Sequence, residues 1–385
     1  MTRSAATDPP LLKLSTPDDI LATVPYLLGF HPVRSLVVIG LRGERSRVGM
    51  SMRMDIDGGP PDEMAATVLR ALTQDGAQQV LLVLYDPDDV DADAADPDDA
   101  PSGALLAELG ERLQDAGLRV RDALAVQDGR WRSYLCDDDG CCPPEGRPLR
   151  DARAPGGASV VDATAVSAGM TALPDREALQ RSLEPPTPWC HAATAQAADR
   201  LFERLLPRLV SDQLDVEDEL LAAIEALIPR FTERTPSLSD DEVATVSVAL
   251  ALIEVRDTVI TWGLRDDVEA LRRLLLEVVR RTGAPEHVPV ATVLAWLSYL
   301  QGSGGLANCA LELVFRSDPE YPLALLVDRM LQGGLHPDVL RKSTADTAAE
   351  LVRRRRDRRR AAVGAQSERG SRRSGSTRRS RRSVG

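Results

Sequence analysis

The hydrophobic periodicity of this chain changes near residue 158, and that change constrains the fold class more than any other feature. Before it, short apolar or alternating runs typical of strands, such as 35–40 and 47–56, are interspersed with stretches of helical periodicity. After it the strand signals stop and helical periodicity alone continues. The sequence therefore predicts an α/β N-terminal domain, with a mixed sheet and flanking helices, followed by an all-α domain.

Local signals refine the positions of elements and domains. Thr16 and Asp19 have the spacing of a capping box at the start of the first helix, and Asp128-Gly129 is a strong hairpin signal between two strands. Three prolines between 185 and 188 mark a boundary. We predict five regions: a disordered leader (1–13), an α/β domain with a cysteine loop (14–150), a helical connector (151–190), an all-α domain (191–350) and a disordered Arg-rich tail (351–385).

The net charge of −12 conceals a division between an acidic body and a basic tail. Residues 351–385 contain fourteen Arg against one Asp and one Glu, which gives the tail +12 and leaves −24 on the rest of the chain. Such a tail could bind nucleic acid nonspecifically by neutralising phosphates, although it has no aromatic residue to stack on bases. Alternatively, it folds back on the acidic body or stays solvated.

The composition argues against a helical membrane protein and favours the cytoplasm. The chain has no apolar run of about 20 residues, and its N-terminus lacks the apolar core of a signal peptide. Five cysteines in a chain of 385 residues do not resemble the disulfide framework of a small secreted domain. We therefore expect a cytoplasmic protein with no membrane partner.

Three of the five cysteines fall within seven residues, at Cys136, Cys141 and Cys142. A structural zinc site needs four ligands, so this loop would require a fourth from His31 or Cys190. Adjacent cysteines are poor candidates for sharing one metal, because consecutive side chains diverge. A redox role, in which Cys136 exchanges a disulfide with one of the other two, is a second interpretation. The third, which we favour, is a tight loop whose small cysteines pack under a hairpin.

The turn between the first helix and the first strand carries further candidate residues. His31, Arg34 and Ser35 lie where α/β folds often place ligand sites. Ser35 and His31 resemble a nucleophile and its base, but no Gly-x-Ser-x-Gly elbow surrounds Ser35. The alternative interpretation is a turn that His31 caps. On the second strand, the alternation of side chains places Arg53 and Asp55 on one face. They could form an anion site or a solvated ion pair. The candidate ligand or anion site comprises His31, Arg34, Ser35, Arg53, Asp55, Arg130 and Trp131.

Three blocks of the sequence resemble one known family. Residues 15–43, 130–149 and 295–326 resemble, in the same order, an actinobacterial family of unknown function, DUF4192. The residues that match its motifs are Gly29, Phe30, His31, Pro32, Ser35, Arg53, Asp55, Trp131, Cys136, Cys141, Cys142, Pro143 and Gly146. The resemblance implies a cytoplasmic actinobacterial protein with no assigned activity, cofactor or catalytic residue. It also implies that the cysteine loop and the His31 turn are family features, whereas the Arg-rich tail is an addition in this chain.

Taken together, the signals favour a non-enzymatic binding or regulatory protein with an unknown protein or small-molecule ligand. The folding signals are strong, whereas no complete catalytic constellation is visible in the sequence. One alternative is a hydrolase or thiol-dependent enzyme that uses His31 and the cysteine loop, which requires these side chains to converge in one pocket. Another is association with nucleic acid through residues 351–385.

Overall fold

The computed structural model describes residues 16–85, 101–150, 157–167, 170–185, 190–232 and 236–379, and for 101–104, 190 and 362–379 it describes the backbone alone. The predicted leader lies outside these residues. The chain separates into two compact units, each built from two segments. Unit 1 comprises Met1–Glu184 and Ser298–Pro337, and unit 2 comprises Pro185–Leu297 and Asp338–Gly385.

Unit 1 is organised around a mixed sheet, as the sequence predicts. Among the described residues the strands are β1 (Ser35–Arg42), β2 (Arg47–Asp55), β3 (Gln79–Tyr85), β4 (Arg119–Gln127), β5 (Arg130–Ser133) and β6 (Arg147–Pro148). Their order across the sheet is β2-β1-β3-β4-β5-β6. The β3–β4 pair is parallel and the other neighbouring pairs are antiparallel.

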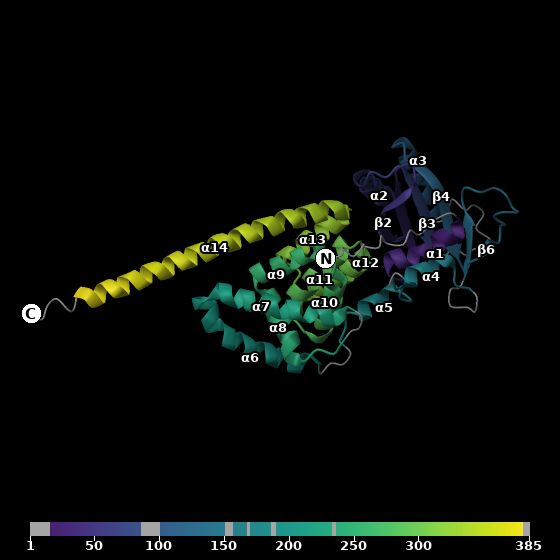
Figure 1. Ribbon diagram of the computed structural model, residues 1–385. Helices are drawn as coiled ribbons and strands as arrows, with labels where there is room; N and C mark the ends of the chain where they lie inside the picture. The colour runs from purple at the N-terminus through teal and green to yellow at the C-terminus, as the bar shows by residue number, and fades with distance from the viewer. Residues whose placement is uncertain are drawn as a thin grey trace, which may run out of the picture. The chain divides into compact units, whose positions relative to one another are not determined.

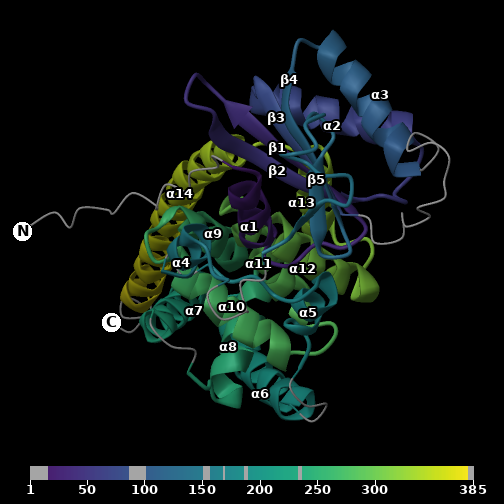
Figure 2. The same ribbon diagram turned by 90° about the vertical axis from the view of Figure 1, so that its right-hand side faces the viewer.

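Helices cover both faces of this sheet (Figures 1 and 2). On one face, α2 (Pro61–Asp75) and α3 (Pro101–Asp115) pack against strand residues such as Leu36 and Leu82 to form a core cluster. Since successive strand residues point to opposite faces, the intervening residues point to the other side, where α1 (Pro17–Leu28) lies. The sheet is therefore a central layer with apolar side chains on both sides.

Several local sequence signals are confirmed at the level of single residues. Thr16 and Asp19 form the predicted capping box at the start of α1, and Gly29 ends that helix with a φ of 84°. Asp128 and Gly129 join β4 to β5 with φ values of 47° and 70°. Both values are positive, as the favoured two-residue hairpin turn requires.

A buried carboxylate joins α2 to the β1–β2 hairpin. The side chain of Asp75, the last residue of α2, is only 1% exposed. Its Oδ1 accepts a hydrogen bond of 3.0 Å from the backbone N–H of Met50 and lies 3.3 Å from Nε2 of His336. Its Oδ2 lies 3.7 Å from Nε of Arg42. Gly49 makes room for this carboxylate, because a Cβ at that position would collide with Oδ2.

The remaining helices of unit 1 come from both of its chain segments. They are α4 (Val160–Ser167), α5 (Arg176–Arg181), α12 (Gly304–Ser317) and α13 (Pro322–Gln332). The sequence predicts residues 191–350 as one domain, whereas contacts in the structure assign Ser298–Pro337 to unit 1.

The physical reason for this assignment is the packing of α12. Glu312 of α12 accepts hydrogen bonds from the side chains of Arg176 and Gln180 of α5. Gly305 approaches the end of α1 so closely that an added Cβ would lie 2.6 Å from the carbonyl oxygen of Leu28. Such contacts between residues far apart in sequence leave no trace in local hydrophobic periodicity.

The described elements of unit 2 are helices. The longer ones are α6 (Cys190–Ser211), α7 (Gln213–Leu227), α8 (Asp240–Ala251), α9 (Ile253–Thr261), α10 (Val268–Arg281), most of α11 (His287–Leu300) and α14 (Pro337–Arg379). A capping box of Ser239 and Glu242 starts α8. Within the described part of the chain, no helix is both long and apolar enough to cross a lipid bilayer.

The course of α14 differs from the predicted disorder of the Arg-rich tail. The helix continues without interruption through this segment to Arg379 (Figure 1). Arg355, Arg358 and Arg359 form ion pairs with Glu217 and Asp218 of α7, and the Arg358–Glu217 contact measures 2.9 Å. These contacts hold residues 355–359 of the helix against α7. They also engage guanidinium groups that would otherwise be available to a phosphate backbone.

Candidate functional site

Unit 1 contains a cavity of about 140 Å³ beside the turn that follows α1. Its lining comes from that turn, from the end of β2 and from the start of α5: Phe30, His31, Val33, Arg53, Asp55, Asp175, Arg176 and Glu177. Three of the residues predicted from the sequence, His31, Arg53 and Asp55, are therefore brought together here. The cavity combines basic and acidic side chains on a partly apolar wall.

Backbone hydrogen bonds hold the His31 turn against the segment before α5. The N–H of His31 donates to the carbonyl oxygen of Leu173 at 3.0 Å. The N–H of Leu173 donates to the carbonyl oxygen of Gly29 at 2.8 Å. Phe30 and Leu173 form an isolated parallel bridge between these two stretches. This pairing places the start of α5 beside the turn and so completes the cavity.

Arg53 is oriented by two neighbours on the floor of the cavity. Its Nε donates to Oγ of Ser35 at 2.7 Å, and its Nη2 donates to Oδ1 of Asp55 at 2.5 Å. Ser35 in turn donates its hydroxyl proton to the carbonyl oxygen of Val33 at 2.7 Å. The serine hydroxyl thus serves as a buried acceptor for Arg53. It does not donate to an imidazole, as an activated nucleophile would.

The opposite wall of the cavity comes from the first residues of α5, which the sequence analysis missed. Oδ1 of Asp175 accepts a hydrogen bond of 2.6 Å from the N–H of Ala178 and so caps the helix. Burial by itself lowers the pKa of Arg176, but the charge of Glu312 and the hydrogen bond to it, together with the charges of Cys309 and Asp55, raise the pKa overall, so Arg176 stays charged. The sequence signal that could have placed these residues at the start of a helix is Asp175, a residue type favoured at the N-cap.

The other residues of the predicted ligand site lie outside the lining of this cavity. Arg34 donates to Oδ2 of Asp57 at 2.7 Å. Arg130 donates from Nε to the carbonyl oxygen of Glu145 at 2.6 Å and from Nη2 to that of the next residue at 2.8 Å. Trp131 is 4% exposed and belongs to the core. Arg130 thus supports the cysteine loop, and neither Arg130 nor Trp131 lines the cavity.

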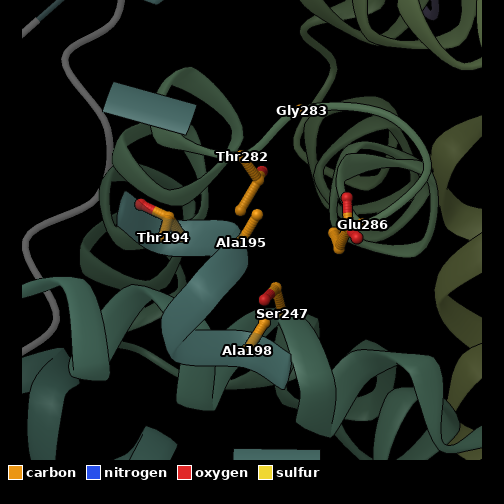
Figure 3. Close-up of a pocket in the computed structure, with 7 residues that line it drawn as sticks. All are labelled: Thr194, Ala195, Ala198, Ser247, Thr282, Gly283 and Glu286. Carbon is orange, nitrogen blue, oxygen red and sulfur yellow. The ribbon is translucent and has the colours of Figure 1, made fainter. Parts of the chain in front are cut away.

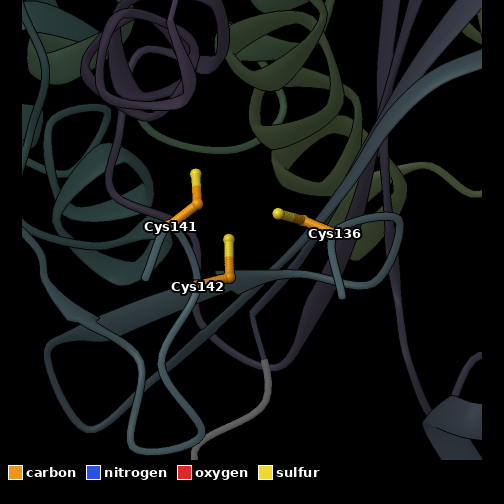
Figure 4. A group of neighbouring side chains, drawn as sticks. All are labelled: Cys136, Cys141 and Cys142. Atoms are coloured by element: carbon orange, nitrogen blue, oxygen red, sulfur yellow. The ribbon is translucent and has the colours of Figure 1, made fainter. Parts of the chain in front are cut away.

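The three clustered cysteines converge at the end of β5. The sulfur atoms of Cys136, Cys141 and Cys142 all lie within 4.8 Å of one another (Figure 4). The expectation that consecutive side chains diverge does not hold here, because the backbone turns at this point. The N–H groups of Cys141 and Cys142 both donate to the carbonyl oxygen of Asp138, at 2.9 and 2.6 Å.

The proposed fourth ligands do not join this cluster. Within the described part of the chain, no histidine or carboxylate completes the group formed by the three sulfur atoms, and this includes His31. The side chain of Cys190 lies outside the described residues. All three cluster cysteines carry free thiols, as does the buried Cys309 of α12.

Burial is the main influence on the pKa of the Cys142 thiol. It raises the pKa of Cys142, and a hydrogen bond with Cys136 and the charges of the other two thiols raise it further. A backbone hydrogen bond from Ser133 acts in the opposite direction. The Cys142 thiol is therefore protonated at neutral pH.

A much smaller cavity lies in unit 2 (Figure 3). It is lined by Thr194, Ala195, Ala198, Ser247, Thr282, Gly283 and Glu286. Its volume of about 10 Å³ is about that of a single water-sized probe, so it has no room for a ligand. Two of its hydroxyl groups, on Ser247 and Thr282, donate to backbone carbonyl oxygens of their own helices.

Comparison with known proteins identifies a family but no function. Residues 17–338 match the model of a family described as Domain of unknown function (DUF4192). No curated protein and no solved structure matches the chain significantly.

Proposed function

The chain belongs to the DUF4192 family, and from its geometry we propose that it is a non-enzymatic binding or regulatory protein whose ligand is a small zwitterion. We also infer that an α/β domain is followed by an all-α domain, and that the protein works in the cytoplasm. The four free thiols among the described residues support a reducing compartment.

The observation that carries this proposal is the juxtaposition of opposite charges in the cavity of unit 1. Arg53 and Arg176 face the same space as Asp55, Asp175 and Glu177. A carboxylate group of the ligand would pair with Arg53, whose guanidinium is held in place by hydrogen bonds from Nε to Ser35 and from Nη2 to Asp55. An ammonium group would lie against the acidic side chains.

The size of the cavity narrows the ligand class. Pockets for drug-sized molecules have volumes of roughly 300–1,000 Å³. A cavity of about 140 Å³ fits a molecule with far fewer atoms, such as a free α-amino acid. The engagement of Ser35 by Val33 and Arg53 favours binding over hydrolysis, because a serine nucleophile requires contact with a base.

Calorimetry with matched small molecules tests this proposal. Alanine serves as the zwitterionic probe, while propionate and ethylamine each carry one of its two charges. We expect alanine to bind more tightly than either. Arg53→Gln should weaken alanine binding about 10- to 100-fold, the effect of losing hydrogen bonds between charged groups.

Arg34→Gln is the matched control, because Arg34 is paired with Asp57 outside the cavity lining. It should bind alanine as the unmodified chain does. Equal binding of alanine by the Arg53→Gln variant would contradict the proposal, as would a failure of alanine to bind to the unmodified chain. Turnover in a hydrolase screen that is lost in His31→Ala would overturn the non-enzymatic assignment.

A further inference from the structure

We propose that Cys136, Cys141 and Cys142 form a binding site for a soft, thiol-seeking metal ion, and that the ion is Zn²⁺. None of these cysteines lines the cavity of unit 1, so the site is separate from the proposed ligand site and its test does not depend on amino-acid binding.

The spacing of the sulfur atoms is close to what zinc requires. With Zn–S bonds of about 2.3 Å in tetrahedral geometry, two sulfur ligands lie about 3.8 Å apart. The three sulfur atoms already lie within 4.8 Å of one another, so each pair needs to close by at most about 1 Å. A disulfide would require an S–S distance of about 2.0 Å, which is a much larger movement.

The backbone of the loop holds the cysteines in this arrangement before a metal arrives. Asp138 accepts hydrogen bonds from the N–H groups of Cys141 and Cys142 through its carbonyl oxygen, and from the N–H of Gly140 through Oδ1 at 2.9 Å. This turn directs two consecutive side chains to the same side of the loop, toward Cys136 (Figure 4). A preorganised ligand set binds its ion with less loss of conformational freedom.

Two arginines fasten the loop to the edge of the sheet. Arg130 of β5 donates to the carbonyl oxygens of Glu145 and Gly146, and Arg147 of β6 donates to that of Gly140 at 3.2 Å. Gly146 has a φ of 71°, and a Cβ there would lie 3.1 Å from the carbonyl oxygen of Trp131. The positions of the cysteines are therefore set by a strand on each side of the loop.

The chemistry of the ligands selects the ion. Thiolates bind soft or borderline ions such as Zn²⁺, whereas Mg²⁺ and Ca²⁺ prefer oxygen ligands. Three protein ligands leave one position of the zinc tetrahedron open, and the exposure of Cys141 gives water access to it. The site we infer thus resembles zinc sites with an exchangeable water more than closed structural sites.

Metal titration of the full chain, purified without oxygen and treated with a chelator, tests the site. Cobalt(II) should produce the near-ultraviolet absorption of thiolate-to-metal charge transfer, and zinc should abolish it at about one equivalent per chain. Zinc should also protect the three cluster thiols from a thiol-counting reagent. The variant Cys141→Ser should bind zinc at least about 100-fold more weakly. Loss of a residue that only hydrogen-bonds to a ligand weakens metal binding about 10- to 100-fold, and loss of a ligand itself should weaken it more.

Cys309→Ala is the matched control, since it removes a thiol that is buried in α12 and lies outside the cluster. It should bind zinc like the unmodified chain, and circular dichroism should show both variants folded. Absence of the cobalt absorption would overturn the proposal. Equal zinc affinity in Cys141→Ser, or a disulfide within the cluster of the anaerobic protein, would overturn it as well.

Discussion

Asp75 offers a quantitative test of how the β1–β2 hairpin is attached to α2. Replacement by Ala removes a side chain that is 1% exposed and that contacts Met50, Arg42 and His336. Its carboxylate lies between a backbone donor and two basic side chains. We therefore expect the variant Asp75→Ala to destabilise unit 1 by more than a typical surface substitution does.

The magnitude follows from the individual contacts. Loss of the acceptor for the N–H of Met50 costs about 1–3 kcal/mol if that donor stays unsatisfied. The contact with Arg42 spans 3.7 Å and its guanidinium is 37% exposed, so solvent screening limits its contribution to less than about 1 kcal/mol. The sum is a loss of roughly 1–4 kcal/mol in the free energy of unfolding.

Amide hydrogen exchange is the suitable assay, because a chain with two compact units need not unfold in one step. Peptides from β1 and β2 should exchange faster in Asp75→Ala. Asp75→Asn should fall between this variant and the unmodified chain, because its amide oxygen can still accept from Met50. Asp115→Ala is the matched control, since Asp115 is also the last residue of its helix but is exposed.

An unchanged exchange rate in β1 and β2 of Asp75→Ala would refute this reasoning. The same holds if Asp115→Ala has an equal effect, because the loss would then reflect the helix end and not the buried carboxylate. Asp115→Ala is a surface substitution and should change the free energy of unfolding by less than about 0.5 kcal/mol.

Three further predictions concern packing, charge and thiol reactivity. Gly305→Ala should destabilise unit 1 by about 1–3 kcal/mol through overpacking against α1. Gly304→Ala, where the Cβ meets open space, should not, and hydrogen exchange of peptides from α1 and α12 compares the two variants. Arg358→Met should destabilise unit 2 by about 1–3 kcal/mol by leaving the buried carboxylate of Glu217 in α7 with fewer partners. Arg353→Met, on the surface, should cost less than about 0.5 kcal/mol, and hydrogen exchange of peptides from α7 compares the two. Burial raises the pKa of Cys309 to about 11, so its alkylation, followed by mass spectrometry, should rise about tenfold per pH unit up to that value; rapid alkylation at neutral pH in the folded chain would contradict the burial.

The sequence predicted most successfully those features that depend on neighbouring residues. The capping box of Thr16 and Asp19 spans a single helical turn, and the Asp128-Gly129 hairpin depends on two adjacent residues with positive φ. In both cases the residues that make the interaction are close in sequence, so a local sequence pattern is enough to predict the geometry. The strands and the mixed sheet follow from the same kind of local periodicity.

Contacts across long sequence distances could not be predicted in this way. Arg176 reaches the cavity because the bridge between Phe30 and Leu173 aligns two distant stretches, and no periodicity records that pairing. The convergence of Cys141 and Cys142 was missed for a different reason. The argument that consecutive side chains diverge assumes extended backbone, whereas the carbonyl oxygen of Asp138 organises a turn.

The interleaving of the two units has a consequence for biosynthesis. Unit 1 needs both Met1–Glu184 and Ser298–Pro337, so a nascent chain cannot complete it until α12 and α13 have left the ribosome. Until then, the apolar surfaces of Phe30 and Leu179 that meet α12 at Gly305 stay open to water and to chaperones. A ribosome that stalls within Pro185–Leu297 would therefore carry a chain whose first unit is unfinished.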